Sequence, residues 1–417
     1  MKGWKTVICR LIAQEARRVF SRSMQFEAGL HPHMPVCDTS GSRLLYIHVP
    51  FCEQLCPYCS FNRVRFEESL CRKYFAALRN ELFLYKERSY NFGGIYVGGG
   101  TPTVLMDELE KTLETAKDYF SVREISVETN PNHLTPDRLV VLQRVGVNRL
   151  SVGIQSFDDN LLRAMGRFEK YGSGSKNVER LKATTGYFDT LNADMIFNFP
   201  IQTDEGLDRD LMLLLETGVD QVTYYPLMVS DLTRNVVEKT LGIVDYRKER
   251  RMYHRIVERL LPEYRFSSAW CFSRKESMID EYIVDYDEYA GVGSGSIGYM
   301  NGICYANTFD LQEYIERLKR NEIPLMASRK FSLRDRIRYD FIMKLFGLEL
   351  AIAPVRAQYG KRLIRYLWPD IAAFMIAGGL RYRRGTLYLT GRGRYYWVIM
   401  MREFFTAVNN FRAFCLG

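Results

Sequence analysis

Six short apolar runs, separated by stretches of helical length, constrain the fold of this chain more than any other feature. The runs are rich in β-branched and aromatic residues, and they begin at Leu44, Gly94, Glu124, Asn148, Leu191 and Gln221. Strands that alternate with helices favour βα units and a parallel sheet, because parallel neighbours need a crossover, which is usually helical. The sequence therefore predicts an α/β fold, most economically a partial (β/α)6 TIM-like barrel over residues 43–330.

Two stretches between these runs have the periodicity of amphipathic helices. They are RKYFAALRNELFLYKE from Arg72 and MDELEKTLETAKDYF from Met106. Apolar residues recur in both at helical spacing, so one face of each is expected to pack on the sheet. Asp107 is the predicted N-cap of the second helix.

The two ends of the chain differ from this alternating core. Residues 1–42 combine a basic amphipathic segment with a linker rich in Pro, Ser and Gly. Residues 331–417 form the third expected segment, a small and mostly helical C-terminal domain with a short hairpin, which is basic and rich in aromatic residues.

Charge is concentrated at both ends, within a net charge of +9. Residues 1–42 carry six Lys and Arg against three Asp and Glu, and residues 351–417 carry eleven against two, so the middle is slightly acidic. A basic stripe across a central groove is typical of proteins that bind nucleic acid, so nucleic acid is not expected as a partner. An odd number of cysteines, nine, without an export signal or a long apolar run predicts a cytoplasmic protein without a membrane-spanning helix.

Cys52, Cys56 and Cys59 form a C-x3-C-x2-C motif directly after the first predicted strand. Three thiolates at this spacing can each bind one iron of a cubane cluster and leave the fourth iron open to a small chelating molecule. The alternative is a zinc site, but zinc usually takes a fourth nearby Cys or His, and His48 lies before the motif on the strand. The three cysteines are therefore the predicted metal ligands.

The second predicted strand ends in a turn with three glycines, YVGGGTPT from Tyr96. Glycine removes side chains where a backbone must come close to a ligand. In barrels of βα units the active site lies at the carboxyl ends of the strands, where both this turn and the cysteine loop are expected.

These motifs resemble the radical S-adenosylmethionine (SAM) enzymes, in the branch typified by oxygen-independent coproporphyrinogen oxidase. The matching stretches, in order over roughly residues 43–345, are YIHVPFCEQLCPYC, YVGGGTPT, VETNP, SVGIQSFDD and ADMIFNFP. The resemblance implies a radical SAM barrel with one 4Fe-4S cluster on the three cysteines. It also implies that the amino and carboxylate groups of SAM chelate the open iron.

The resemblance further implies two SAM molecules. The residues that match contacts to the cluster-bound SAM are Tyr46, Gly99, Glu128 and Ile297. Those that match contacts to the second SAM are Tyr58, Gly100, Thr101, Gln155, Arg167 and Asp194, with Pro226 nearby. Each residue alone is more often a cap, a turn residue or a surface charge, but their recurrence at successive strand ends favours a site.

Phe61 stands two residues after the third cysteine, where the decarboxylating coproporphyrinogen enzymes typically have another Cys. Among the relatives, the heme chaperones and the class C radical SAM methyltransferases have Phe there. A methyltransferase also needs a base, for which Tyr225, Asp194 and His133 are weak candidates.

The substrate is inferred from the basic, aromatic ends, which are typical of contact with anionic lipid or of a cover over an apolar substrate. We therefore expect a class C methyltransferase that methylates carbon eight of the menaquinone ring, a lipophilic aromatic molecule. It would take electrons from a donor such as flavodoxin or ferredoxin and contact the inner face of the cytoplasmic membrane. The alternative is a heme chaperone or a heme- or porphyrin-modifying radical SAM protein, with His31, His33 and Cys37 as candidate heme ligands.

Overall fold

The computed structural model describes residues 2–26, 43–279 and 281–416. All six predicted strands are present and lie side by side in chain order, each parallel to the next. They are β1 (Arg43–Val49), β4 (Gly94–Gly99), β5 (Glu124–Thr129), β6 (Arg149–Gln155), β7 (Thr190–Phe197) and β8 (Gln221–Pro226). Nearly every residue of these strands is buried, as expected of a parallel sheet covered on both faces. The predicted α/β barrel fold is confirmed.

Further strands extend this sheet at both edges to a total of twelve. At the β1 edge, β11 (Glu288–Val292) pairs in parallel and is followed by three antiparallel strands: β12 (Ile297–Met300), β13 (Ile303–Asn307) and β14 (Leu325–Lys330). At the β8 edge, β10 (Cys271–Ser273) and β9 (Arg265–Phe266) pair antiparallel. The sequence did not predict these additions, because these strands are short and lie outside the regular βα alternation.

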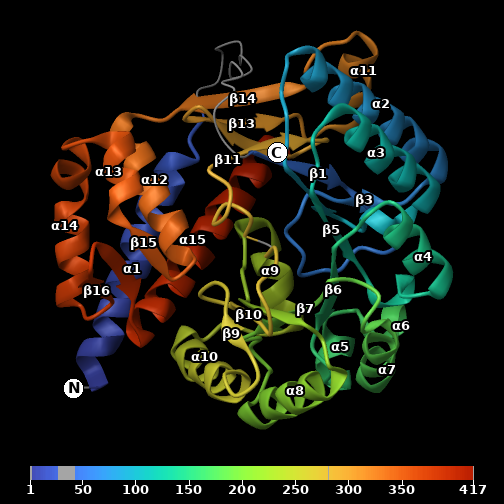
Figure 1. Ribbon diagram of the computed structural model, residues 1–417. Helices are drawn as coiled ribbons and strands as arrows, with labels where there is room; N and C mark the ends of the chain where they lie inside the picture. Colours follow the sequence, from blue (N-terminus) through green and yellow to red (C-terminus); the bar gives the residue numbers. More distant parts are fainter. Residues whose placement is uncertain (1, 27–42, 280, 417) are drawn as a thin grey trace.

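The helices that connect the parallel strands lie on the outside of the barrel (Figure 1). They are α2 (Glu68–Glu87), α3 (Met106–Tyr119), α4 (Pro136–Arg144), α5 (Asp159–Ala164), α6 (Phe168–Tyr171), α7 (Gly174–Thr184) and α8 (Asp204–Thr217). After β8 come α9 (Asp231–Thr240) and α10 (Tyr246–Leu260), and α11 (Leu311–Lys319) packs beside α2. The two predicted amphipathic helices are confirmed as α2 and α3, but Asp107 is not the N-cap. The cap position of α3 is Leu105, and Asp107 lies in the first turn.

The C-terminal part of the chain contains helices and the predicted hairpin. Its elements are α12 (Leu333–Phe346), β15 (Glu349–Ala351), α13 (Ile352–Tyr359), α14 (Arg362–Ile376), β16 (Leu380–Arg383), β17 (Thr386–Leu389) and α15 (Gly391–Leu416). Figure 1 shows the N-terminal helix α1 (Lys2–Ser23) running beside α15. The rings of Phe20 and Phe404 meet edge to face at 5.3 Å, and Arg17 pairs with Glu403 at 2.9 Å.

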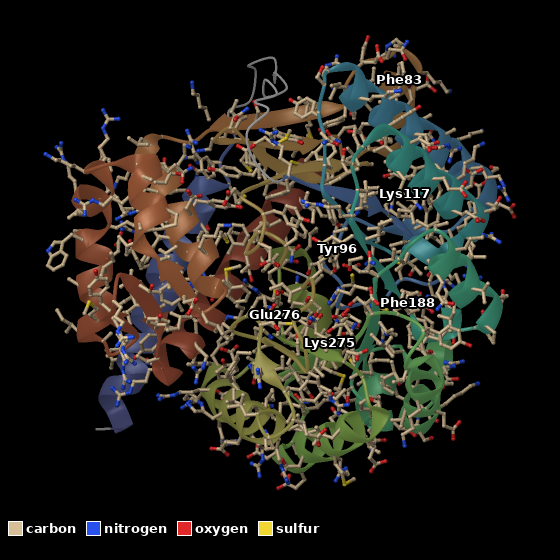
Figure 2. The ribbon with its side chains drawn as sticks, in the orientation of Figure 1. Phe83, Tyr96, Lys117, Phe188, Lys275 and Glu276 are labelled. Atoms are coloured by element: carbon tan, nitrogen blue, oxygen red, sulfur yellow. The ribbon has the colours of Figure 1, made fainter. Side chains whose placement is uncertain are left out.

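Side chains fill the space between the strands and the surrounding helices, with Tyr96 near the middle of the molecule and Phe83 at its outer edge (Figure 2). Within the described residues, no helix combines the length and the apolar character needed to cross a membrane. His31, His33 and Cys37 lie outside the described residues. Contact of the chain ends with a membrane surface stays a prediction.

Candidate functional site

The cysteine motif forms a loop that begins at the carboxyl end of β1. The loop is closed by a short parallel pair, β2 (Phe51–Cys52) with β3 (Val64–Arg65). Inside it, Nη2 of Arg63 donates hydrogen bonds to the carbonyl oxygens of Cys56, at 2.6 Å, and Cys59, at 2.8 Å. Burial raises the pKa of the free Cys52 thiol to about 11, so this thiol is protonated until a metal displaces the proton.

His48 and Tyr46 fix the start of this loop from β1. Because the partner of His48 Nε2 is the carbonyl oxygen of Asn62, at 2.9 Å, this nitrogen carries the proton and donates it. Nδ1 then accepts a hydrogen bond from the Tyr46 hydroxyl, also at 2.9 Å. Burial lowers the pKa of His48 to about 4, which keeps the ring neutral at physiological pH. The pair therefore orients Tyr46 without adding charge to the site.

The glycine turn after β4 brings the backbone against both the cysteine loop and Glu128. A Cβ atom on Gly100 would lie 2.6 Å from the carbonyl oxygen of Phe51, and one on Gly98 would lie 2.7 Å from Glu128 Oε1. The Glu128 carboxylate accepts hydrogen bonds from the Tyr96 hydroxyl, at 2.9 Å, and from the amide of Gly99, at 3.1 Å. The turn therefore fixes the Glu128 carboxylate at the end of β5.

Polar groups from β6, β7 and the segment between α5 and α6 complete the site. Asp194 accepts hydrogen bonds from Ser151 Oγ and Asn192 Nδ2, both at 2.8 Å. Arg167 donates to the carbonyl oxygen of Gly153 and to the hydroxyl of Tyr58. Beside these groups, Gln155 has a φ of 75°, a left-handed conformation that is uncommon outside glycine.

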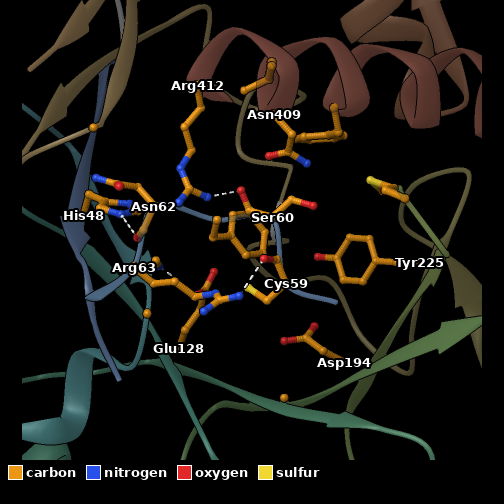
Figure 3. A pocket seen from close by; sticks show the side chains of 18 of the residues that line it. His48, Cys59, Ser60, Asn62, Arg63, Glu128, Asp194, Tyr225, Asn409 and Arg412 are labelled. Atoms are coloured by element: carbon orange, nitrogen blue, oxygen red, sulfur yellow. Dashed lines mark hydrogen bonds between the residues drawn. The ribbon is translucent and has the colours of Figure 1, made fainter. Parts of the chain in front are cut away.

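These residues line one cavity of about 420 Å³, which is within the size range of pockets for small organic ligands. The cavity lies between the strand ends and the helix α15. Aromatic residues dominate its wall: Tyr46, Tyr58, Tyr96, Tyr171, Tyr225, Tyr282, Tyr289, Tyr299, Tyr339, Phe331, Phe404 and Phe405. Figure 3 shows Arg412 and Asn409 reaching into it from α15, with Glu128 and Asp194 on the opposite side.

The structure brings nearly all of the predicted site residues together on this cavity. Those that line it are Cys52, Cys56, Cys59, Tyr46, Tyr58, Gly99, Gly100, Thr101, Glu128, Gln155, Arg167, Asp194, Tyr225, Pro226 and Ile297. This placement is compatible with their predicted roles but does not test them. The three thiols and the glycine turn fit an iron–sulfur cluster with a chelating ligand, because they line the same cavity and the thiols are the soft donors that iron–sulfur clusters require.

His133 is the predicted residue that does not line the cavity. It is buried behind the glycine turn, where Nδ1 lies 2.7 Å from Thr103 Oγ1 and Nε2 lies 3.6 Å from Glu53 Oε1. Burial lowers its pKa to about 4. His133 is therefore a structural residue in this geometry rather than a base that faces a ligand.

Sequence reasoning missed the residues that reach the cavity from outside the strand ends. Arg63, Tyr282, Asn409 and Arg412 line it but belong to no recognised motif. For α15 a signal existed, since the aromatic tail was expected to cover an apolar substrate or to lie against a membrane. Phe404, Phe405 and Val408 indeed cover the cavity.

Comparisons with known proteins support the resemblance to radical SAM proteins that the sequence motifs indicated. The family model of the radical SAM superfamily matches residues 46–214. The heme chaperone HemW of Lactococcus lactis subsp. lactis (strain IL1403) is 31% identical over 281 residues, which cover 65% of this chain and 73% of that protein. The heme chaperone HemW of Bacillus subtilis (strain 168) is 27% identical over 370 residues, 84% of this chain and 95% of that protein.

Among solved structures, coproporphyrinogen III oxidase (HemN) from Escherichia coli has the same fold, with a TM-score of 0.72. It is 21% identical and covers 87% of this chain and 90% of its own. The chain therefore belongs to the radical SAM superfamily, in the branch that includes the heme chaperone HemW and coproporphyrinogen oxidase. Membership implies a 4Fe-4S cluster and SAM, but it gives no support to a second SAM molecule.

The expectation of a menaquinone methyltransferase is wrong. The relatives that match across most of the chain are heme chaperones and an oxygen-independent coproporphyrinogen III oxidase, not quinone methyltransferases. The expectation was based on the basic, aromatic ends of the chain, because such ends are typical of contact with lipid. In the structure, α1 and α15 pack on one another, and Phe404 and Phe405 of α15 face the cavity.

Proposed function

We propose that this protein binds a tetrapyrrole, heme or a porphyrin, in the aromatic cavity and acts on it by SAM-dependent radical chemistry. The observation that carries the proposal is that the cysteine loop and the aromatic wall of α15 line the same cavity. A flat apolar macrocycle suits a wall of tyrosine and phenylalanine rings. Relatives that are heme chaperones support a tetrapyrrole as the ligand.

In this proposal Cys52, Cys56 and Cys59 hold the 4Fe-4S cluster. When bound and reduced by a donor such as flavodoxin or ferredoxin, the cluster and SAM supply one-electron chemistry that removes a hydrogen atom from a neighbouring molecule. The protein residues expected to hold SAM are Tyr46, Gly99, Glu128 and Ile297. The Glu128 carboxylate, already fixed by Tyr96 and Gly99, offers its remaining lone pairs to the hydroxyl or amino groups of SAM.

The other polar residues of the cavity orient the ligand and handle protons. Arg167 and Tyr58 form a hydrogen-bonded pair on one side. Of the three base candidates, Asp194 and Tyr225 line the cavity and His133 does not, so Asp194 and Tyr225 are the two candidates positioned to accept a proton from the ligand. The aromatic wall and α15 exclude water from the ligand.

A second candidate function is heme carriage without chemical change. It is favoured by similarity to the Bacillus subtilis heme chaperone along 95% of that protein. A chaperone would bind heme in the same cavity and release it unaltered to a recipient.

The two functions separate in one anaerobic experiment. The cluster is reconstituted, and SAM, a low-potential reductant and either heme or a coproporphyrin are added. Mass spectrometry then follows the tetrapyrrole and deoxyadenosine. Deoxyadenosine that increases with tetrapyrrole concentration, together with a change in tetrapyrrole mass, is the expected result. Saturable heme binding with unaltered mass and transfer to an apo-hemoprotein would favour the chaperone, and no binding of any tetrapyrrole would refute both.

A further inference from the structure

The helix α15 presents one face to the cavity. Phe404, Val408 and Arg412 line it at a spacing of four residues, and Phe405 and Asn409 line it one position further on. Residues four apart lie on the same side of an α-helix, so this face runs from apolar rings to polar groups towards the C-terminal end. Arg412 is the cation at the end of this face.

Arg412 has no carboxylate partner among the described residues, and its ionisable neighbours are the Cys59 thiol and Arg63. It donates one hydrogen bond from Nη1 to the carbonyl oxygen of Ser60, while its Nε is buried and has no acceptor there. None of the carboxylates that the structure describes lies within ion-pair distance of it. Another arginine of the same helix, Arg402, is held by the buried carboxylates of Glu249 and Glu403. A partly buried cation whose Nε has neither contact with water nor an acceptor is costly without an anion, which indicates that an anion completes this site.

Arg63, a cation near Arg412, already forms hydrogen bonds within the cysteine loop. Arg63 donates to the carbonyl oxygens of Cys56 and Cys59, so its guanidinium holds the loop closed. The acidic side chains Glu128 and Asp194 lie across the cavity from Arg412 (Figure 3). The cavity therefore has the carboxylates of Glu128 and Asp194 on the strand side, with the cations Arg167 and Lys170 also in its lining, and the guanidinium of Arg412 on the α15 side.

The geometry points to Arg412 as the anchor for a carboxylate of the ligand, with Asn409 one turn earlier as a second donor. The inference relies on the proposed function for the identity of the ligand, and there the carboxylate is a propionate of the tetrapyrrole. A guanidinium matches the two oxygens of a carboxylate and binds it through parallel hydrogen bonds. This contact would place the macrocycle edge at α15 and its face along the aromatic wall.

Heme and heme dimethyl ester, in which the propionates are esterified, test the inference. Binding to the holoprotein is followed by absorbance for the wild type, Arg412→Met and Arg412→Lys, with Arg392→Met at the other end of α15 as the matched control. The wild type and Arg392→Met are expected to bind heme about ten- to hundredfold more tightly than the ester. Arg412→Met should bind both with similar affinity, and Arg412→Lys should keep part of the preference.

Iron content distinguishes this role from one in the cluster. It should be unchanged in Arg412→Met, because Arg412 is not a cluster ligand, whereas the deoxyadenosine formed with heme should fall as heme occupancy falls. A variant that keeps the wild-type preference for heme, or that loses iron together with heme binding, would overturn the inference while leaving tetrapyrrole binding intact. A wild-type protein that binds neither heme nor its ester would instead overturn the proposed function.

Discussion

Glu128 shows how a single side chain in this site is positioned by its neighbours. Its two carboxylate oxygens accept separate hydrogen bonds, one from Tyr96 and one from the amide of Gly99. The hydrogen bond from the Gly99 amide fixes the carboxylate relative to Gly99. The φ of Gly99 is 116°, a backbone conformation that only glycine adopts readily. The orientation of the carboxylate and the shape of the turn therefore depend on each other.

Glu128→Gln should weaken SAM binding by about ten- to hundredfold, equivalent to the loss of one hydrogen bond to a charged group. The substituted amide places an N–H where either Tyr96 or Gly99 already donates, so one bond is lost. Equilibrium dialysis of SAM against the reconstituted protein measures the change. Glu124→Gln, at the opposite end of β5, is the control and should leave SAM affinity unchanged. Equal effects of the two substitutions would show that Glu128 acts only through the stability of β5.

The turn after β6 depends on a buried carboxylate from the helix α8. Asp210 accepts hydrogen bonds from Ser156 Oγ and the amide of Phe157, both at 2.7 Å. These two residues directly follow Gln155, whose left-handed backbone turns the chain into the cavity. Burial raises the pKa of Asp210 to about 7, because desolvation outweighs both hydrogen bonds.

Asp210 makes stability depend on pH in a defined direction. Between about pH 4 and pH 7 the folded protein keeps the proton that the unfolded chain releases, so the free energy of unfolding falls as pH rises, by up to about 4 kcal/mol. Asp210→Asn keeps the hydrogen bond from the Phe157 amide, replaces the Ser156 bond by one in which the new amide donates to Oγ, and removes this dependence. Urea unfolding at pH 5 and pH 7.5 measures the free energy of unfolding. Relative to the wild type, Asp210→Asn should be more stable at pH 7.5 than at pH 5, whereas Asp208→Asn on the same helix should show no such change. A constant difference between variant and wild type at both pH values would contradict the prediction.

The attachment of α15 to the barrel rests on a buried ion pair. Arg402 contacts both carboxylate oxygens of Glu249 on α10, and the Tyr395 hydroxyl donates to the same carboxylate at 3.0 Å. Arg402 and Glu249 are almost fully buried. By contrast, the side chain of Arg17, which pairs with α15 from α1, is 62% exposed.

Arg402→Met should lower the free energy of unfolding by about 3–5 kcal/mol, because it leaves the Glu249 charge buried without a partner. Arg17→Met should cost about 0–1 kcal/mol, as is usual for an exposed pair. Chemical denaturation of both variants measures the difference. Replacing Glu249 as well, as Glu249→Gln, should recover part of the loss. Similar costs for the two arginine variants would mean that α15 is held mainly by its apolar face.

The elements that the sequence predicted are those whose signals are local. Each strand is followed at once by its turn, so the motifs alone are enough to assign Cys52, Gly99 and Glu128 to the ends of strands, whereas Asp194 lies within β7, three residues before its end. The part of the cavity wall that α15 forms had no such local signal, because Arg412 and its partner Ser60 are 352 residues apart in the sequence. Asp107 failed as a predicted cap because α3 begins one residue before it, at Met106, and its carboxylate instead pairs with Arg72 on the neighbouring helix α2.

In the whole molecule, the cavity is shared between the barrel and a helix from the far end of the chain. Its floor comes from the strand ends and its cover from α15. A ligand bound there contacts both parts, so it stabilises the arrangement in which they are closed. Binding of the proposed tetrapyrrole should therefore stabilise the contact between α15 and the barrel.

Hydrogen–deuterium exchange of the holoprotein with and without heme tests this coupling. A ligand at one hundred times its dissociation constant stabilises the bound form by about 2.7 kcal/mol, which slows exchange through opening of the site by up to about a hundredfold. The slowing should be concentrated in residues 404–412 of α15 and in the cysteine loop, because these line the cavity and must separate from the ligand when it opens. Helix α8 lies on the outside of the barrel and does not line the cavity, so its exchange should not change. Heme that binds with full occupancy but leaves α15 exchange unaltered would place the ligand elsewhere on the molecule.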